Sequence, residues 1–214
     1  MPEHEYRRAA LVTKVAIPPM RLAARALLDL EVTGAEHVPS RGGLIVAANH
    51  LSHLDPPVVT IAVDRDIRYI ALDDLFGRGV LFDRFTLFFG AIPTNRDGIP
   101  LGPLREAIGH VAAGGTVGFF PEGRRVAYWG ESEPKLGAAW LAWMTGAPLL
   151  PVAVHGTERL LSASFEAIRR PSVRVWVEEP LLWHDFAKCV DPVGAMTERW
   201  RHVVGGHLGA WWSR

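Results

Sequence analysis

Short apolar runs alternate with longer helical patterns along this 214-residue chain, and no other feature restricts the possible folds as strongly. Strands that alternate with helices predict a mostly parallel sheet with helices on both faces. We therefore expect a single α/β domain, since no repeat, low-complexity tract or linker divides the chain. Strands are predicted within 42–50, 67–72, 116–123, 149–157 and 171–183, and helices within 55–64, 102–115 and 135–148.

Two further segments carry helical patterns. Residues 77–95 are expected to hold a strongly apolar helix and then a return strand that ends at Pro93. Residues 191–214 are expected to form a terminal helix weakened by Gly205 and Gly206, because glycine disfavours a helix interior.

The overall charge excludes some classes of partner. The 23 basic and 23 acidic residues cancel, so bulk electrostatics predict neither nucleic-acid binding nor an acidic partner. A single cysteine, Cys189, excludes an internal disulfide and a cysteine-based zinc site, and it is interpreted as a bystander. This cysteine usage, and the lack of a continuous apolar signal region, agree with a reducing cytosol.

The first 25 residues are basic and amphipathic. They carry five lysine or arginine residues against Glu3 and Glu5, with apolar residues between them, and no stretch is long enough to span a bilayer. Such a segment either lies in the lipid headgroup region or packs on the protein's own core with its arginines solvated. Pro18 and Pro19 are expected to break or kink it into two short helices. We treat residues 1–29 as a separate segment and residues 30–214 as the folded domain.

The stretch AANHLSHLDPP, residues 47–57, holds the most informative polar side chains. His50, His53 and Asp55 are possible metal ligands, although the H-E-x-x-H pattern of helical zinc sites is absent. Asp55 before two prolines could instead cap the following helix. In a third interpretation Asp55 orients His50, which then acts as a general base, and His53 is a bystander. No G-x-S-x-G motif supplies a serine nucleophile, so such a base would act on a substrate hydroxyl.

Four short blocks then indicate a family. NHLSHLD (49–55) resembles the N-H-x-S-x-x-D block of the glycerolipid acyltransferases, the 1-acylglycerol-3-phosphate acyltransferases and their relatives. GAIPTNR (90–96), FPEGRR (120–125) and LLPVAV (149–154) resemble the family's later blocks in order and approximate spacing. KLGAAWLA (135–142) resembles the lysine-glycine-alanine helix that usually lies between the last two. The resemblance covers about residues 30–180.

The resemblance implies a role for each motif residue. His50 would be the general base and Asp55 its orienter, in the transfer of an acyl group from acyl-CoA or acyl carrier protein to a hydroxyl. Arg96 would bind the acceptor's phosphate, for which a guanidinium is suited. Ser52, Glu122 and Gly123 would contribute to the substrate pocket, although Ser52 could equally bond its own loop and Gly123 could simply form a tight turn. The thioester is a co-substrate, and neither a metal nor another cofactor is implied.

The sequence also departs from the family pattern. Arg124 stands where threonine or serine is usual, and Asp73 and Asp74 lie where many members are rich in lysine. These departures bear on the acceptor: 1-acylglycerol-3-phosphate is expected, with another glycerolipid or a glycolipid as the alternative. A lipid-binding module that does not catalyse and, more distantly, a metal-dependent hydrolase are the alternatives from other classes.

A lipid substrate also bears on where the chain works. An enzyme with a membrane lipid as substrate must reach the bilayer surface. The basic segment 1–29 is therefore expected to hold the protein on the cytoplasmic face of the membrane as a monotopic or peripheral enzyme.

Overall fold

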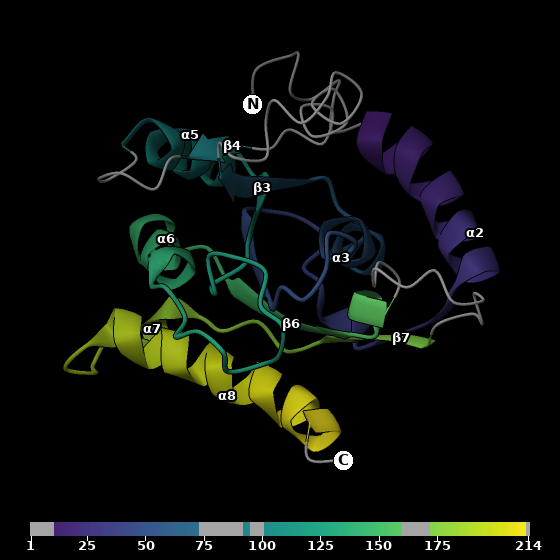
Figure 1. The fold of residues 1–214 in the computed structure, drawn as a ribbon. Coiled ribbons are helices and arrows are strands. Elements are labelled where there is room, and N and C mark those ends of the chain that lie inside the picture. Colours follow the sequence, from purple (N-terminus) through teal and green to yellow (C-terminus); the bar gives the residue numbers. More distant parts are fainter. Residues whose placement is uncertain (1–10, 73–91, 95–100, 160–171, 213–214) are drawn as a thin grey trace.

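The computed structural model describes residues 11–72, 92–94, 101–159 and 172–212, and within them the strands form one sheet (Figure 1). The strand order is β1-β7-β6-β2-β5-β3-β4, and neighbours are parallel except β6 and β7. The strands are β1 (Asp29–Thr33), β2 (Leu44–Ala48), β3 (Ile67–Leu72), β4 (Ile92–Thr94), β5 (Thr116–Phe119), β6 (Leu149–His155) and β7 (Ser172–Val177).

Helices cover both faces of this sheet. On one face α5 (Leu101–Ala112), α6 (Gly137–Thr145) and α8 (Pro192–Trp212) pack on the sheet in one hydrophobic cluster. On the other face α3 (Asp55–Val63) packs on the sheet, and α2 (Ile17–Leu27) packs on α3 and β1. The short elements are the π-helix η1 (Val12–Ala16), the 3-10 helices η2 (Ala35–His37) and η4 (Thr157–Arg159), and α7 (Trp183–Phe186). The predicted α/β class, with a mostly parallel sheet between helices, is confirmed.

The central strands follow directly from their composition. Every residue of β2 and β6 is buried, which matches their continuous apolar sequence and their covering by helices on both faces. Strand β1 was not predicted, because its sequence DLEVT carries charges and its exposed and half-buried residues alternate at the sheet's edge. Arg174 of β7 holds β1 in place, since its guanidinium pairs with Asp29 at 3.2 Å and with Glu31 at 2.9 Å.

The two prolines of the N-terminal segment mark a change of helix type rather than a break in the chain's helical backbone. Helical backbone continues from η1 into α2 without interruption, and Pro18 and Pro19 occupy the first turn of α2. Proline fits there because the first N–H groups of an α-helix have no acceptor within the helix. The turn before them is π-helical, and it closes with a hydrogen bond from the Ile17 N–H to the Val12 carbonyl.

The expected terminal helix is α8, which runs without a break through Gly205 and Gly206. A Cβ atom at position 205 would lie 3.1 Å from Nε1 of Trp129, so glycine here makes room for the indole. Trp129 in turn packs edge-on against Trp200, whose Nε1–H donates to the Ala47 carbonyl at 2.8 Å. Trp129 thus packs against α8, and Trp200 ties α8 to β2.

The apolar helix expected within 77–95 lies outside the described residues, as do Asp73 and Asp74. The return strand expected after that helix corresponds to β4. Within the described part of the chain, no helix combines the length and the apolar character needed to cross a bilayer. The division of the chain into 1–29 and 30–214 stays a prediction.

Candidate active site

Two loops meet at the carboxyl ends of the neighbouring parallel strands β2 and β5. The His50 N–H donates to Oε1 of Glu122 at 3.2 Å, and the Val126 N–H donates to the His50 carbonyl at 2.9 Å. Residues 49–55 and 120–126 therefore form one site, as expected for polar loops at the same edge of a parallel sheet.

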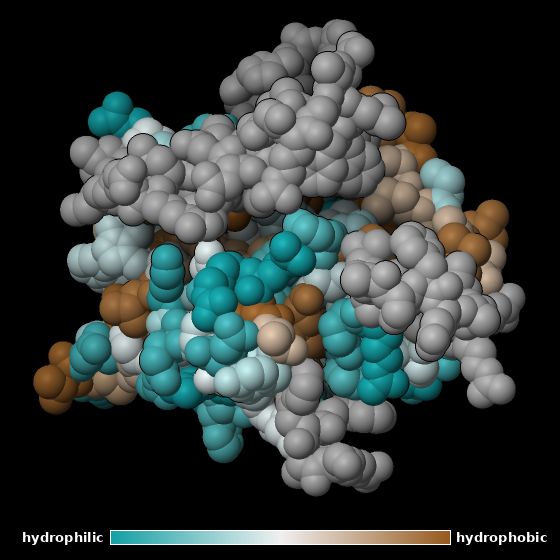
Figure 2. All heavy atoms as spheres, in the orientation of Figure 1, coloured by the Kyte–Doolittle hydropathy of each residue, from teal (hydrophilic) through white to brown (hydrophobic). Residues whose placement is uncertain are grey.

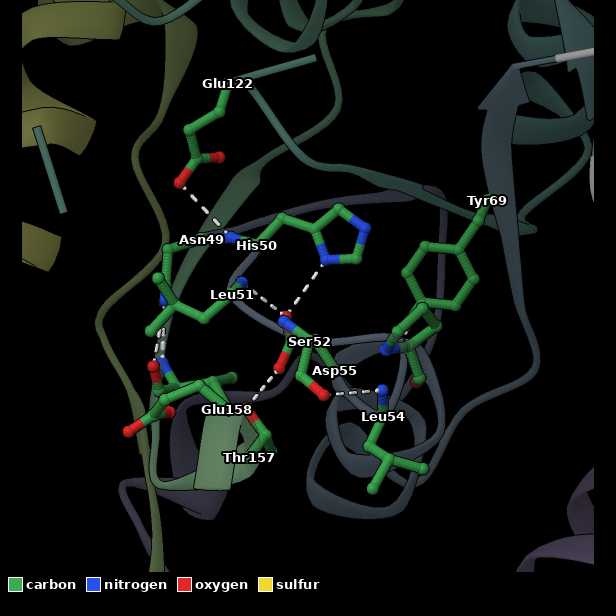
Figure 3. A network of polar contacts seen from close by, with 12 residues as sticks. Asn49, His50, Leu51, Ser52, Leu54, Asp55, Tyr69, Glu122, Thr157 and Glu158 are labelled. Atoms are coloured by element: carbon green, nitrogen blue, oxygen red, sulfur yellow. Dashed lines mark hydrogen bonds and ion pairs between the residues drawn. The ribbon is translucent and has the colours of Figure 1, made fainter. Parts of the chain in front are cut away.

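His50 and Asp55 form the centre of this site (Figure 3). Nδ1 of His50 lies 2.9 Å from Oδ2 of Asp55, and the Asp55 side chain is completely buried, whereas 15% of the His50 side chain is exposed. The second ring nitrogen of His50 points away from Asp55 (Figure 3). A buried carboxylate bonded to Nδ1 favours the tautomer with a free lone pair on Nε2, which is the form that accepts a proton.

The Asp55 carboxylate is directed back toward its own loop. Oδ2 accepts hydrogen bonds from the N–H groups of Leu51 and Ser52, each at 2.7 Å. The expected capping role is wrong, because Leu54 is the N-cap residue of α3 and no side chain caps that helix. Ser52 is buried, and its Oγ accepts a hydrogen bond from the Leu54 N–H at 3.3 Å. The hydroxyl of Ser52 therefore bonds its own loop, and its contact with substrate stays a prediction.

Two polar residues that the sequence pattern did not indicate also belong to the site. The side-chain amide of the buried Asn49 donates to the Val154 carbonyl at 2.8 Å and accepts from the Val154 N–H at 2.7 Å. Thr157, which follows β6, donates from Oγ1 to Oδ1 of Asp55 at 2.5 Å. Both contacts connect the loop 49–55 to β6, the neighbour of β2, or to the 3-10 helix η4 that follows β6. The signal that could have found Thr157 is the polar HGT segment after a buried strand.

An aromatic stack lies beside the imidazole. The rings of His50 and Phe120 stack with centroids 4.0 Å apart, and Tyr69 stacks on Phe120 at 5.4 Å. The Tyr69 hydroxyl donates to the Pro56 carbonyl at 3.0 Å, and burial raises the pKa of this phenol well above its usual value. The stack restricts the imidazole to one plane, while Asp55 sets its rotation within that plane.

Glu122 is a buried carboxyl group close to this pair. Burial raises its pKa to about 7 against the opposing effect of its hydrogen bonds with backbone amides, and the negative charge of Asp55 contributes further. Oε1 accepts from the His50 N–H, whereas Oε2 has no hydrogen-bond partner in the described structure. A protonated Glu122 is therefore present over much of the range below neutral pH.

Gly123 forms a tight turn after β5. It has a φ of 69°, in the left-handed region that glycine adopts readily, and its N–H donates to the Phe120 carbonyl at 2.9 Å. The side chain of Lys135 lies over it, because a Cβ atom at position 123 would come within 2.7 Å of the Lys135 Cε. The Gly123 N–H is thus engaged in the turn, and a contact of Gly123 with substrate stays a prediction.

Arg124, the departure from the family's third block, bonds its own loop. Its guanidinium lies 2.8 Å from Oε1 of Glu131, and Oε2 of Glu131 accepts from the Ala127 N–H at 2.5 Å. The hydrogen bond from Ala127, more than the neighbouring guanidinium, lowers the pKa of Glu131. Tyr128 in the same loop is half exposed. This ion pair holds the loop at the border of the site.

The remaining candidates are placed differently. His53 is exposed on the loop, and Arg96 lies outside the described residues. No three histidine, cysteine, aspartate or glutamate side chains in 11–72, 92–94, 101–159 or 172–212 are arranged to hold a metal ion. The geometry therefore does not support the metal interpretation of His50, His53 and Asp55.

A histidine oriented by a buried carboxylate, at the carboxyl edge of a mostly parallel sheet, is the arrangement of an enzyme that uses general acid–base chemistry. The model of the acyltransferase family matches residues 29–155, and the chain belongs to this family. This match confirms the resemblance found in the sequence blocks and makes the chain an enzyme.

Several relatives are similar over most or much of the chain. The 1-acyl-sn-glycerol-3-phosphate acyltransferase of Bacillus subtilis is 30% identical over 82% of this chain and 88% of its own length. The enzyme of the same name from Borreliella burgdorferi is 29% identical over 61% of this chain and 52% of its own. The structure also matches the crystal structure of the 1-acyl-sn-glycerophosphate acyltransferase PlsC from Thermotoga maritima, with 25% sequence identity and a TM-score of 0.74. The match covers the whole of this chain and 85% of the T. maritima chain.

Proposed function

We propose that this acyltransferase transfers a long acyl chain from acyl-CoA or acyl carrier protein to the free hydroxyl of 1-acylglycerol-3-phosphate, which gives phosphatidic acid. The reaction places the enzyme in phospholipid biosynthesis. The names of the relatives from B. subtilis, B. burgdorferi and T. maritima support this acceptor. The observation that carries the chemistry is the hydrogen bond between Nδ1 of His50 and the buried Asp55.

In the proposed reaction, Nε2 of His50 takes the proton of the acceptor hydroxyl as its oxygen attacks the thioester carbonyl. A carbon–oxygen bond forms, the carbon–sulfur bond then breaks, and the imidazolium returns the proton to the departing thiolate. Asp55 stabilises the positive charge that the imidazole carries between these two steps. The hydroxyl is the nucleophile, so the chemistry needs no covalent acyl-enzyme.

The substrate pocket is proposed to include Ser52, Arg96, Glu122 and Gly123. Arg96 would bind the phosphate of the acceptor through its paired donors. Arg96→Ala should therefore raise the KM for 1-acylglycerol-3-phosphate, by about tenfold for the loss of a charge-assisted hydrogen bond. The KM for acyl-CoA should change much less, and equal effects on both substrates would contradict this assignment.

The reaction is tested by thiol release from palmitoyl-CoA, measured with and without 1-acylglycerol-3-phosphate. Wild type should release thiol only with acceptor, and His50→Ala should abolish it. Asp55→Asn should remain folded and lose about 10²- to 10⁴-fold in kcat, because the imidazole loses its orienting charge. His53→Ala serves as the matched control, since this exposed histidine lies in the same loop. If wild type shows no acceptor-dependent release, a panel of other glycerolipids and glycolipids, with acyl carrier protein as donor, replaces this acceptor.

The enzyme is further proposed to bind the cytoplasmic face of a membrane through α2. Arg21 is not directed to solvent: its Nη2 donates to the Ile61 carbonyl at 3.2 Å and pairs with Asp64 at 2.9 Å, at the C-terminal end of α3. Apolar residues face outward instead, with Val15 59% and Leu22 70% exposed.

The hydrophobic residues on this side gather in one area of the surface over α2 (Figure 2). The large hydrophobic side chains exposed along residues 11–27 are Leu11, Val15, Leu22 and Leu27. An exposed apolar face of this kind, on a helix whose Arg21 bonds α3, is suited to the headgroup–acyl boundary of a bilayer.

Sedimentation with vesicles of phosphatidylcholine and phosphatidylglycerol tests this surface. The double variant Val15→Glu/Leu22→Glu should bind at least about tenfold more weakly, because two apolar side chains no longer enter the lipid. Val190→Glu is the control, since Val190 is fully exposed on the loop between α7 and α8. Equal sedimentation of the double variant and wild type would place the membrane contact elsewhere.

A further inference from the structure

We propose that Thr157 is a positioning residue, which fixes the Asp55 carboxylate so that Asp55 in turn holds His50 in its reactive tautomer. The proposal rests on the proposed role of His50 as general base. Its basis is the hydrogen bond of 2.5 Å from Oγ1 of Thr157 to Oδ1 of Asp55, two residues that both have no exposed surface.

The two oxygens of the Asp55 carboxylate have different partners. Oδ2 accepts from Nδ1 of His50 and from the N–H groups of Leu51 and Ser52, all within the same loop. In the described structure, Oδ1 accepts from Thr157, which comes from the other side of the site after β6. The hydroxyl thus opposes the three loop donors and prevents rotation of the carboxylate about its Cβ–Cγ bond.

Water cannot replace this hydroxyl at the same position. Thr157 and Asp55 are both completely buried, so loss of the hydroxyl would leave Oδ1 facing apolar atoms. A carboxylate that has lost the donor on one oxygen rotates toward other donors. Rotation of the Asp55 carboxylate would lengthen the hydrogen bond between its Oδ2 and Nδ1 of His50. The effect of Thr157 is therefore transmitted through the orientation of the imidazole.

The backbone before Thr157 is built to deliver it. Gly156 has a φ of 95°, and a Cβ atom there would lie 2.1 Å from the Ser172 carbonyl oxygen on β7. The Gly156 N–H is held by Oε2 of Glu158 at 2.8 Å. Glycine thus allows the chain to turn sharply against β7, and this turn directs Thr157 toward the end of β2 rather than along the sheet.

The loop 49–55 is bound at two points, one on β6 and one on the 3-10 helix η4 that follows it, and the two contacts differ in kind. Asn49 bonds the backbone of Val154, which fixes the position of the loop as a whole. Thr157 bonds the carboxylate itself, which fixes the direction of one functional group. A purely structural role would affect folding stability, whereas a positioning role affects the rate constant of the chemical step.

Three variants separate these roles. Thr157→Val removes the hydroxyl and keeps the shape, and Thr157→Ser keeps the hydroxyl and removes the methyl group. Thr197→Val is the matched control, because Thr197 is also buried but its hydroxyl bonds the Val193 carbonyl within α8. Thr157→Ala replaces the valine variant if that protein does not fold. The assay is the release of thiol from palmitoyl-CoA in the presence of 1-acylglycerol-3-phosphate.

Thr157→Val should lower kcat by about 10- to 100-fold, the usual range for removal of a group that orients a functional histidine from behind. The KM for each substrate should stay within about twofold, since no substrate contact is lost, and Thr157→Ser and Thr197→Val should retain the wild-type kcat. In an Asp55→Asn background, Thr157→Val should have little further effect. A wild-type kcat in Thr157→Val, or equal losses in the valine and serine variants, would overturn the proposal.

A second measurement does not depend on the substrate. In protein labelled with ¹⁵N-histidine, the NMR signals of His50 report which ring nitrogen carries the proton. Wild type and Thr157→Ser should show the Nδ1–H tautomer, and Thr157→Val should show a mixture of both tautomers. An unchanged tautomer in Thr157→Val refutes the positioning role even if the acceptor is misassigned. Absence of turnover in wild type, with the tautomer shifted in Thr157→Val, would refute only the proposed acceptor or donor.

Discussion

Replacement of Glu122 by glutamine should change how the stability of the protein depends on pH. Burial raises the pKa of Glu122 to about 7 in the folded protein, whereas in the unfolded chain it returns to its ordinary value of 4.5. Between these two pH values the folded protein retains a proton that the unfolded chain has released. The contribution of this group to stability is therefore complete below about pH 4.5, and it is lost as the pH rises through about 7.

The size of the effect follows from the difference between the two pKa values of Glu122. Each pH unit corresponds to about 1.36 kcal/mol, so ionisation of the buried carboxyl should lower the free energy of unfolding by roughly 3 kcal/mol. Glutamine does not ionise, and its amide oxygen can still accept the hydrogen bond from the His50 N–H. The stability of Glu122→Gln relative to wild type should thus rise by roughly 3 kcal/mol from about pH 4.5 to about pH 8.

Urea unfolding followed by tryptophan fluorescence, at a series of pH values, measures this difference. Other titrating groups are common to both proteins, so their contributions cancel when the two curves are subtracted. Glu36→Gln is the control, because Glu36 is exposed and remains in contact with water in the folded protein. If the difference between Glu122→Gln and wild type stays constant across the pH range, the buried carboxyl does not ionise near neutrality and the reasoning fails.

Two predictions concern stability alone. Asn49→Asp should lower the free energy of unfolding by at least about 2 kcal/mol, because a buried carboxylate oxygen would then face the Val154 carbonyl. Urea unfolding at neutral pH measures this free energy, and a value within about 0.5 kcal/mol of wild type would contradict the prediction. Gly34→Ala should be more destabilising than Gly42→Ala in thermal unfolding, although both glycines have positive φ. A Cβ atom at position 34 would lie 2.0 Å from the Val177 carbonyl oxygen, whereas a Cβ atom at position 42 would have no atom within 4 Å. At position 42 only about 1 kcal/mol of backbone strain is therefore expected. Equal losses of stability in the two variants would show that the Val177 carbonyl moves aside.

The parts of the fold that the sequence predicts are those whose signal is local. Strands β2 and β6 are uninterrupted apolar runs, which matches their complete burial, and the helices between the strands follow from length and glycine boundaries. Strand β1 has no such signal, because its charges at Asp29 and Glu31 are neutralised by Arg174 from a strand more than 140 residues later. The packing of Trp129 beside Gly205 of α8 likewise joins parts of the chain that are far apart in sequence.

The same distinction separates the parts of the candidate site. His50 and Asp55 are five residues apart, so the spacing itself predicts that they can bond. Thr157 reaches Asp55 from 102 residues away, and its place after a buried strand indicates only the edge of the sheet at which it lies, not the contact itself. The two prolines after Asp55 predict a helix cap, but Oδ2 of Asp55 instead accepts hydrogen bonds from its own loop, from Nδ1 of His50 and the N–H groups of Leu51 and Ser52.

His50 and Asp55 are brought together within a single loop, and this has a consequence for how specificity can change. Oδ2 of Asp55 closes a ring of hydrogen bonds over residues 50–55, so the insertion of one residue there would separate base from orienter. The loop that contains Arg124 and Glu131 has its own ion pair and backbone bonds, and it contacts that ring through the Val126 N–H, which donates to the His50 carbonyl. We therefore expect that the part of this loop beyond Val126 can change, by engineering or by descent, to admit a different acceptor while the bonds that hold His50 and Asp55 remain intact.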